Sequence, residues 1–214
     1  MAMQAHELIK IQEQINEAVE SENKSGKLKQ FIYELTDGGI EEEDIDELVS
    51  FIQLYVQHSV AVILSVIEKA EEEGVRETIV PIIDLIKQYF AFKNDVISDD
   101  LGLYGLVDDA YLTHCLLAEV DRGYTEETGQ AFLNVDMTMA NEFIAALIGS
   151  PRIQFLDNMV SDAFSRENFQ SSFQDLLNNE VDFSEVPDPI WENPDEFEEF
   201  LYLHIQKIGI KRDQ

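Results

Sequence analysis

The residues best suited to chemistry are five aspartates near the middle of the chain: Asp95, Asp99, Asp100, Asp108 and Asp109. Carboxylate oxygens from a short acidic segment suit a hard divalent cation such as Mg²⁺ or Ca²⁺. The spacing lacks the Asp-x-Asp-x-Asp-Gly pattern and the closing glutamate of an EF-hand calcium loop. A divalent-metal-dependent enzyme built on these carboxylates is therefore one hypothesis.

A structural interpretation of the same residues competes with metal binding, and we favour it. Asp108 and Asp109 begin an apolar helical segment, where carboxylates bind free N–H groups and complement the helix dipole by about 0.3 to 1 kcal/mol each. At about 100° per residue, two adjacent side chains point in different directions. Gly102 and Gly105 allow a positive φ or a close backbone approach in the preceding turn. This interpretation predicts a scaffold with no catalytic residue and no bound cofactor.

The segment from Lys93 to Ala118 contains DVISDDLGLYGLVDDAYL. It resembles the signature of the YkvA-like family, in which an aspartate and isoleucine are followed by another aspartate, glycines and a paired Asp-Asp that opens an apolar helix. The resemblance implies a helical hairpin in a small bacterial protein, and it implies no established reaction. Asn94 and Ser98 stand where the family usually has prolines.

Other catalytic patterns are absent from the sequence. Cys115 is the only cysteine, and a single cysteine excludes an internal disulfide and a cysteine-rich zinc site. It lies in an apolar helical segment. The four histidines fall on four predicted helices without a His-x-x-x-His pair, and the apolar neighbours of His58 and His114 predict core positions. No nucleophile elbow, phosphate-binding loop or dinucleotide fingerprint occurs.

The charge of the chain predicts its partners. With 44 acidic and 14 basic residues the net charge is −30, and residues 95–203 alone hold 24 acidic and 3 basic residues, or −21. Such a surface repels nucleic acid phosphates and anionic membranes, and it attracts a basic protein. We therefore predict a non-catalytic interaction protein whose partner is a basic nuclease or toxin, or a nucleic-acid-binding protein that it occupies by mimicry. Alternatively, the charge is only a solvated surface.

Trp191 is a second candidate binding residue. It lies between Pro189 and Pro194 in an acidic irregular segment. An aromatic residue in that setting either covers the core, which we favour, or anchors a partner.

Apolar residues at three- and four-residue spacing predict an all-α bundle. About nine helices are expected, at residues 5–23, 28–35, 45–70, 78–92, 104–121, 134–148, 152–164, 167–177 and 193–207. The third is the expected central helix, and the fourth and fifth form the expected hairpin. Two glycines within residues 121–129 suggest a boundary between a subdomain of residues 1–122 and an acidic one of residues 123–214 packed on it. The alternative is that the chain forms one single domain.

No secretory signal is visible, and the longest apolar run, Val60–Ile67, is too short to cross a bilayer. These features predict a cytoplasmic protein. A membrane-associated helical protein is a third hypothesis, which the net charge disfavours.

Overall fold

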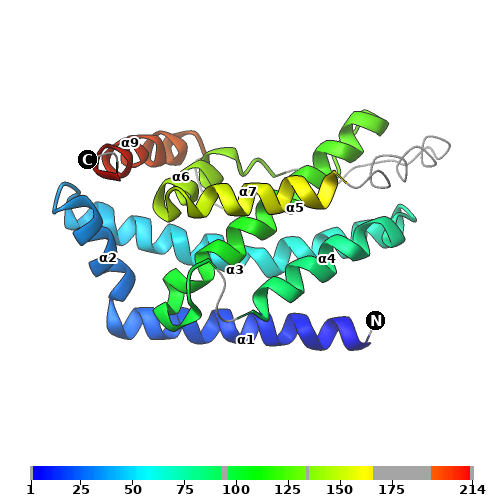
Figure 1. Cartoon of the computed structure of the whole chain (residues 1–214), viewed down its shortest axis with the longest axis horizontal. Coiled ribbons are helices and arrows are strands. Elements are labelled where there is room, and N and C mark those ends of the chain that lie inside the picture. The colour runs from blue at the N-terminus through cyan, green and yellow to red at the C-terminus, as the bar shows by residue number, and fades with distance from the viewer. Residues whose placement is uncertain (1, 93–95, 134, 166–193, 213–214) are drawn as a thin grey trace.

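The structure is a computed structural model that describes residues 2–92, 96–133, 135–165 and 194–212. These residues form eight α-helices and one 3₁₀-helix, with no strand among them, as predicted for an all-α bundle. Figure 1 shows the helices in chain order, and their bounds are α1 Ala2–Ser25, α2 Lys27–Thr36, α3 Glu42–Glu72, α4 Arg76–Phe90, η1 Asp99–Leu106, α5 Val107–Thr128, α6 Thr138–Ile148, α7 Arg152–Phe164 and α9 Pro194–Arg212. The helix expected at residues 167–177 lies outside the described residues, as does Trp191.

α3 forms the centre of the bundle. It contacts α1, α2, α4 and α5, and twelve of its residues are buried. Three acidic residues in its first turn, Glu42, Glu43 and Asp44, lie at the positive end of its dipole and stabilise the start of the helix. By length and composition this helix is apolar enough to span a membrane, and half of its most apolar stretch is buried in the bundle. A central core helix has the same composition.

α5 is the second core helix and contacts α3, α4, α6 and α7. Val107, Ala110, Tyr111 and His114 are all buried, so this segment enters the middle of the bundle. Tyr111 Oη donates a hydrogen bond to Asp157 Oδ1 at 2.9 Å and joins α5 to α7. The helix runs through residue 122, the predicted subdomain boundary, and ends at Thr128, before Gly129 with φ 76°.

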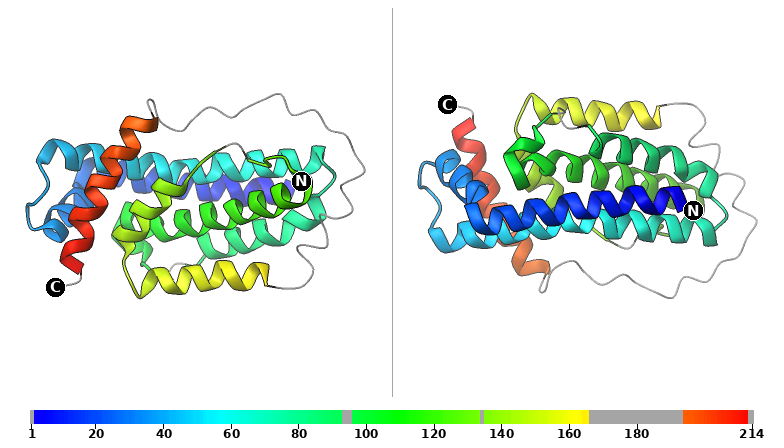
Figure 2. Two further views of the ribbon diagram at one scale, coloured as in Figure 1. Left: turned by 90° about the horizontal axis from the view of Figure 1, so that it is seen from above. Right: turned by 90° about the horizontal axis from the view of Figure 1, so that it is seen from below.

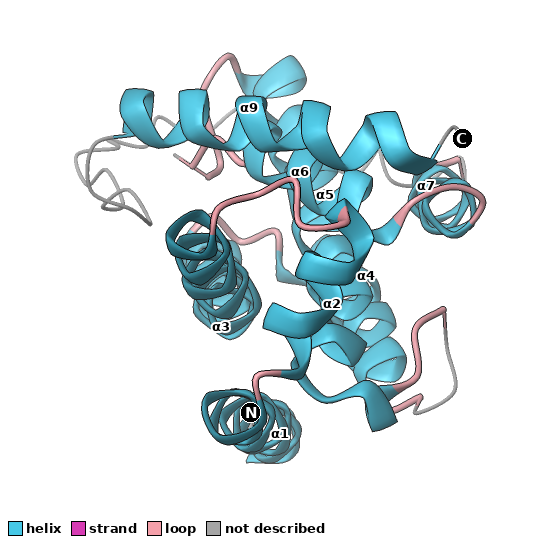
Figure 3. Ribbon diagram, turned by 90° about the vertical axis from the view of Figure 1, so that its left-hand side faces the viewer, coloured by secondary structure: helices cyan, strands magenta, loops and turns pink. Residues whose placement is uncertain are grey.

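One core cluster draws side chains from both predicted subdomains, from Leu8 on α1 to Ile208 on α9. α9 contacts α6 and α2 and crosses the first half of α3, where Phe197 packs on Phe51 with ring centroids 5.3 Å apart. Figures 2 and 3 show α9 lying across the end of the bundle that also holds α2 and the start of α3. The last helix of the chain therefore joins two segments from the first quarter.

Candidate functional site

Asp108 is the most constrained of the predicted site residues. Its side chain is fully buried, and its Oδ2 accepts hydrogen bonds from Tyr89 Oη and from the backbone N–H of Ile97, each at 3.0 Å. Burial raises the pKa of Asp108 to about 6, although these hydrogen bonds oppose the rise. The carboxylate also accepts from its own backbone N–H in the first turn of α5. Asp108 thus fastens the end of α4 and the following loop to α5.

The other predicted aspartates point to different surroundings. Asp99 Oδ2 accepts a hydrogen bond from Gln14 Nε2 on α1 at 3.0 Å, whereas Asp100 is exposed to solvent. Asp109 is buried with 2 % of its surface exposed, and it lies about 100° around α5 from Asp108. Asp95 lies outside the described residues.

These positions do not assemble a described metal site. Within residues 2–92, 96–133, 135–165 and 194–212, no three His, Cys, Asp or Glu side chains are placed to hold one ion. Asp99 and Asp108 repel each other, and this repulsion contributes to the raised pKa of Asp108. The hydrogen bonds of Asp99 and Asp108 join neighbouring segments of the chain, as a structural role requires.

The two glycines of the turn have the roles that the sequence predicts. Gly102 has φ 68° and ψ −132°, a backbone conformation that residues with a side chain rarely adopt. A Cβ on Gly105 would lie 2.6 Å from the carbonyl oxygen of Ser98 and 2.7 Å from Cα of Asp99. The loop before η1 therefore packs directly on the backbone of Gly105.

A second group of polar residues surrounds His114. Its Nε2 lies 3.1 Å from the carbonyl oxygen of Tyr55, and its ring stacks on His58 with centroids 5.5 Å apart. Burial lowers the pKa of His114 to about 3 and the pKa of His58 to about 4. Both imidazoles are therefore neutral at pH 7, as expected for core histidines. Burial also raises the pKa of the Cys115 thiol to about 12, so this cysteine is not an activated nucleophile.

A cavity of about 540 Å³ lies beside His114, between α3, α5 and the segment before α6. Its two carboxylates bind backbone: Asp121 Oδ1 accepts from the N–H of Phe132 and of Leu133 at 2.6 Å, and Asp136 Oδ1 accepts from the N–H of Thr138 at 2.8 Å. Hydrogen bonds from Thr138 lower the pKa of Asp136. These carboxylates hold the chain between α5 and α6 in place, so the cavity offers no described acid–base pair for catalysis.

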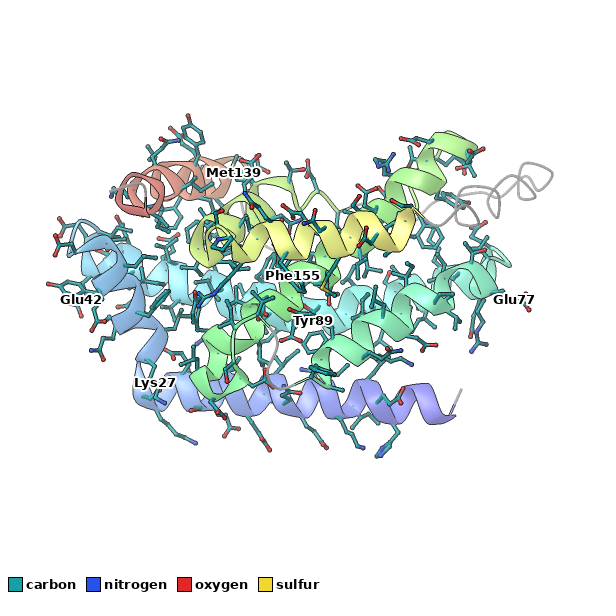
Figure 4. The ribbon with its side chains drawn as sticks, viewed as in Figure 1. Lys27, Glu42, Glu77, Tyr89, Met139 and Phe155 are labelled. Carbon is teal, nitrogen blue, oxygen red and sulfur yellow. The ribbon has the colours of Figure 1, made fainter. Side chains whose placement is uncertain are left out.

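A third feature is a strongly acidic surface, which we call the acidic end. We define it as the acidic residues of the segment 41–47 at the start of α3, together with Glu196 and Glu199 of α9. His204 Nε2 of α9 lies 3.2 Å from Asp44 Oδ2, so the two segments meet although they are 160 residues apart in the chain. Lys29 of α2 pairs with Glu42 at 3.0 Å and with Asp46 at 2.7 Å. Figure 4 labels Glu42 at this end of the bundle.

The outward face of α9 adds apolar side chains to the acidic end. Tyr202 and Leu203 are 53 % and 54 % exposed. They follow the exposed Glu199 by three and four residues, so the three side chains share one face of the helix. Exposed carboxylates and exposed apolar side chains therefore occur together on α9.

Sequence reasoning anticipated the charge and missed this surface. Trp191, the aromatic residue that the sequence suggests as a binding residue, lies outside the described residues. The exposed aromatic residue of α9 is Tyr202. The sequence could have indicated the exposure of Tyr202 and Leu203, because both lie outside the apolar face of α9. That face is formed by Phe197, Leu201 and His204.

The chain was compared with protein families, curated proteins and solved structures, and none of them matches it.

Proposed function

We propose that the protein is a non-catalytic acidic interaction protein that binds a basic protein partner through the acidic end. The observation that carries the proposal is the meeting of two acidic segments, one of which, α9, also exposes Tyr202 and Leu203. Carboxylates around such anchors speed association with a cationic partner and select against anionic ones. Partners of the expected chemistry are a basic nuclease or toxin held inactive, or a nucleic-acid-binding protein occupied by mimicry of phosphates.

The charge balance at the acidic end supports this proposal. Six acidic residues occupy positions 41–47, and the described ion pairs of this segment use Lys29 for two of them, Glu42 and Asp46. Glu43 and Glu47 are exposed. Their repulsion is unfavourable in the free protein and would be relieved by a cationic partner.

The metal-dependent enzyme stays the alternative, and no described contact favours it over the interaction protein. The resemblance of Lys93–Ala118 to the YkvA-like family and the cytoplasmic location also stay predictions. They bear on the origin and the location of the protein, while the proposed partner class rests on the acidic end.

The partner is sought by placing a photo-crosslinking amino acid at Leu203 in the native cells. The matched control places it at Leu64, which is 51 % exposed on the second half of α3. Mass spectrometry of the adducts should identify a basic protein that is captured at position 203 and not at position 64. Identical adducts at both positions, or an acidic protein at position 203, would contradict the proposal.

Binding of the captured protein is then measured with two double variants of equal charge. Glu43→Lys with Glu47→Lys should weaken binding by at least about tenfold at low salt, because like charges then face the partner. Glu13→Lys with Glu17→Lys changes the net charge by the same amount at two exposed residues of α1, and it should weaken binding much less. Equal losses in the two variants would show that only the net charge matters.

A further inference from the structure

Two apolar pockets meet at the start of α7. One, of about 740 Å³, lies between α4, α7 and the loop after α4, and it is lined by residues that include Leu85, Tyr89, Phe155 and Met159. The other, of about 690 Å³, lies between α2, η1 and the α6–α7 turn. Pro151 and Arg152 line both pockets, so together they form one groove. Figure 4 labels Tyr89 and Phe155 on two of its walls and Lys27 at the start of α2.

The described lining of the groove is mostly apolar. Acidic residues make up 44 of the 214 residues of the chain, yet none of the described residues that line the groove is acidic. The cavity beside His114, by contrast, is lined by Asp121 and Asp136. Phe92, Leu101 and Phe155 line the groove with 69 %, 49 % and 56 % of their surfaces exposed. Solvent therefore contacts large apolar side chains that a ligand would cover.

The charges at the groove are positive. Arg152 lies where the two pockets join and Lys27 lines the second pocket. Among the described residues neither cation has an acidic partner within 4.0 Å, whereas Lys24, Lys29, Arg76, Lys87 and Arg122 all have one. Arg152 is also the first residue of α7, whose first turn carries no acidic residue. In a chain of net charge −30, two such cations on one apolar groove form a site for an anion with an apolar body.

We propose that this groove binds the anion of a long-chain fatty acid. The carboxylate pairs with Arg152, because a guanidinium matches the planar carboxylate with two parallel hydrogen bonds. The chain lies along the pocket lined by Leu85, Tyr89, Phe155 and Met159. The residues that line the groove differ from those of the acidic end, so separate variants test the two proposals.

The test is calorimetric titration of the full-length protein with laurate, myristate and palmitate, each below its micelle concentration. Saturable binding at one site should tighten with chain length, by up to about fourfold for each methylene that is buried. Hexadecanol has the same chain as palmitate without the charge, and it should bind at least about tenfold more weakly, since it cannot form the charge-assisted hydrogen bonds.

Three variants locate the site. Arg152→Gln should weaken palmitate binding by at least about tenfold, and Phe155→Asp should weaken it further by placing a carboxylate against the chain. Lys10→Gln removes another exposed cation, on α1 and outside both pockets, and should leave binding unchanged. Arg152 and Phe155 are exposed, so the variants are expected to fold, which circular dichroism checks.

Four outcomes would overturn the proposal: no saturable binding of any chain length, equal binding of hexadecanol, unchanged binding in the Arg152→Gln and Phe155→Asp variants, or association with phosphatidylcholine vesicles in place of the free acid.

Discussion

At the scale of single residues, the five aspartates that suggest a metal site divide among separate structural roles. Asp108 holds α4 and the following loop, Asp99 contacts α1, and Asp100 faces solvent. The most informative of them is Asp108, because a fully buried carboxylate with a pKa of about 6 makes stability depend on pH.

We predict that Asp108→Asn removes a defined part of this pH dependence. The pKa of Asp108 is about 6 in the folded protein, against 3.8 for an unperturbed aspartate, which represents the unfolded chain. The folded state therefore binds the proton more tightly, and the contribution of Asp108 to stability is fully present below pH 3.8 and falls as the pH rises through 6. From pH 4 to pH 7 the stability of the natural protein should drop relative to the variant by about 2 kcal/mol.

Urea unfolding of both proteins at four pH values between 4 and 7 measures this difference. His58 and His114 titrate in both proteins, so their effect, which has the opposite sign, cancels. Asp100→Asn, at an exposed neighbour, should give a curve parallel to that of the natural protein. A parallel curve for Asp108→Asn as well would show that its carboxyl group does not titrate in this range.

At the scale of elements, the turn that leads into α5 depends on backbone packing as much as on its carboxylates. Gly105 contacts the backbone at Ser98 and Asp99, and α5 begins two residues later, at Val107. The direction of this core helix is therefore fixed by a contact that no other residue type permits.

We predict that Gly105→Ala destabilises the protein by about 3 kcal/mol or more, because backbone atoms at 2.6 and 2.7 Å cannot move aside as a flexible side chain would. Gly129→Ala is the matched control. Gly129 has φ 76° and open space around it, so an alanine there should cost only the strain of a left-handed residue, about 1 to 2 kcal/mol. Chemical denaturation of the two variants measures both costs, and equal losses would mean that the turn relaxes around the new methyl group.

At the scale of the whole molecule, the net charge of −30 opposes folding by self-repulsion. The acidic end concentrates this repulsion, whereas Lys87 shows the opposite arrangement, with Glu7 at 2.9 Å and Asp84 at 2.7 Å. Screening by salt acts mainly on exposed charges, so its effect reports on the acidic end more than on buried groups.

We predict that raising NaCl from about 0.02 to 0.5 M increases the free energy of unfolding by an amount on the order of 1 kcal/mol, since the Debye length shortens severalfold. Urea unfolding at each salt concentration measures the change. Replacing exposed Glu41, Glu43 and Glu47 with Gln should reduce the dependence on salt. A stability that falls with salt would mean that favourable ion pairs outweigh the repulsion.

The amino-acid sequence predicts the helices because their signals are local. Apolar spacing, acidic first turns and glycine stops act within a few residues, so the described helices lie close to their predicted ranges. Residue 122, where the sequence suggests a subdomain boundary, lies inside α5. This helix continues past the glycine at position 123 to Thr128. There the packing of Tyr124 on Phe132, with ring centroids 4.9 Å apart, outweighs the poor helix propensity of one glycine.

The sequence by itself determined that this chain is helical, that its core is apolar and that its surface is acidic, because composition and periodicity decide these properties. Only the tertiary structure decided that the aspartates diverge, that Asp44 meets His204, and that Lys27 and Arg152 line one groove. The physical reason is sequence separation. These arrangements depend on contacts between helices far apart in the chain. A local pattern of residues does not predict which helices contact each other.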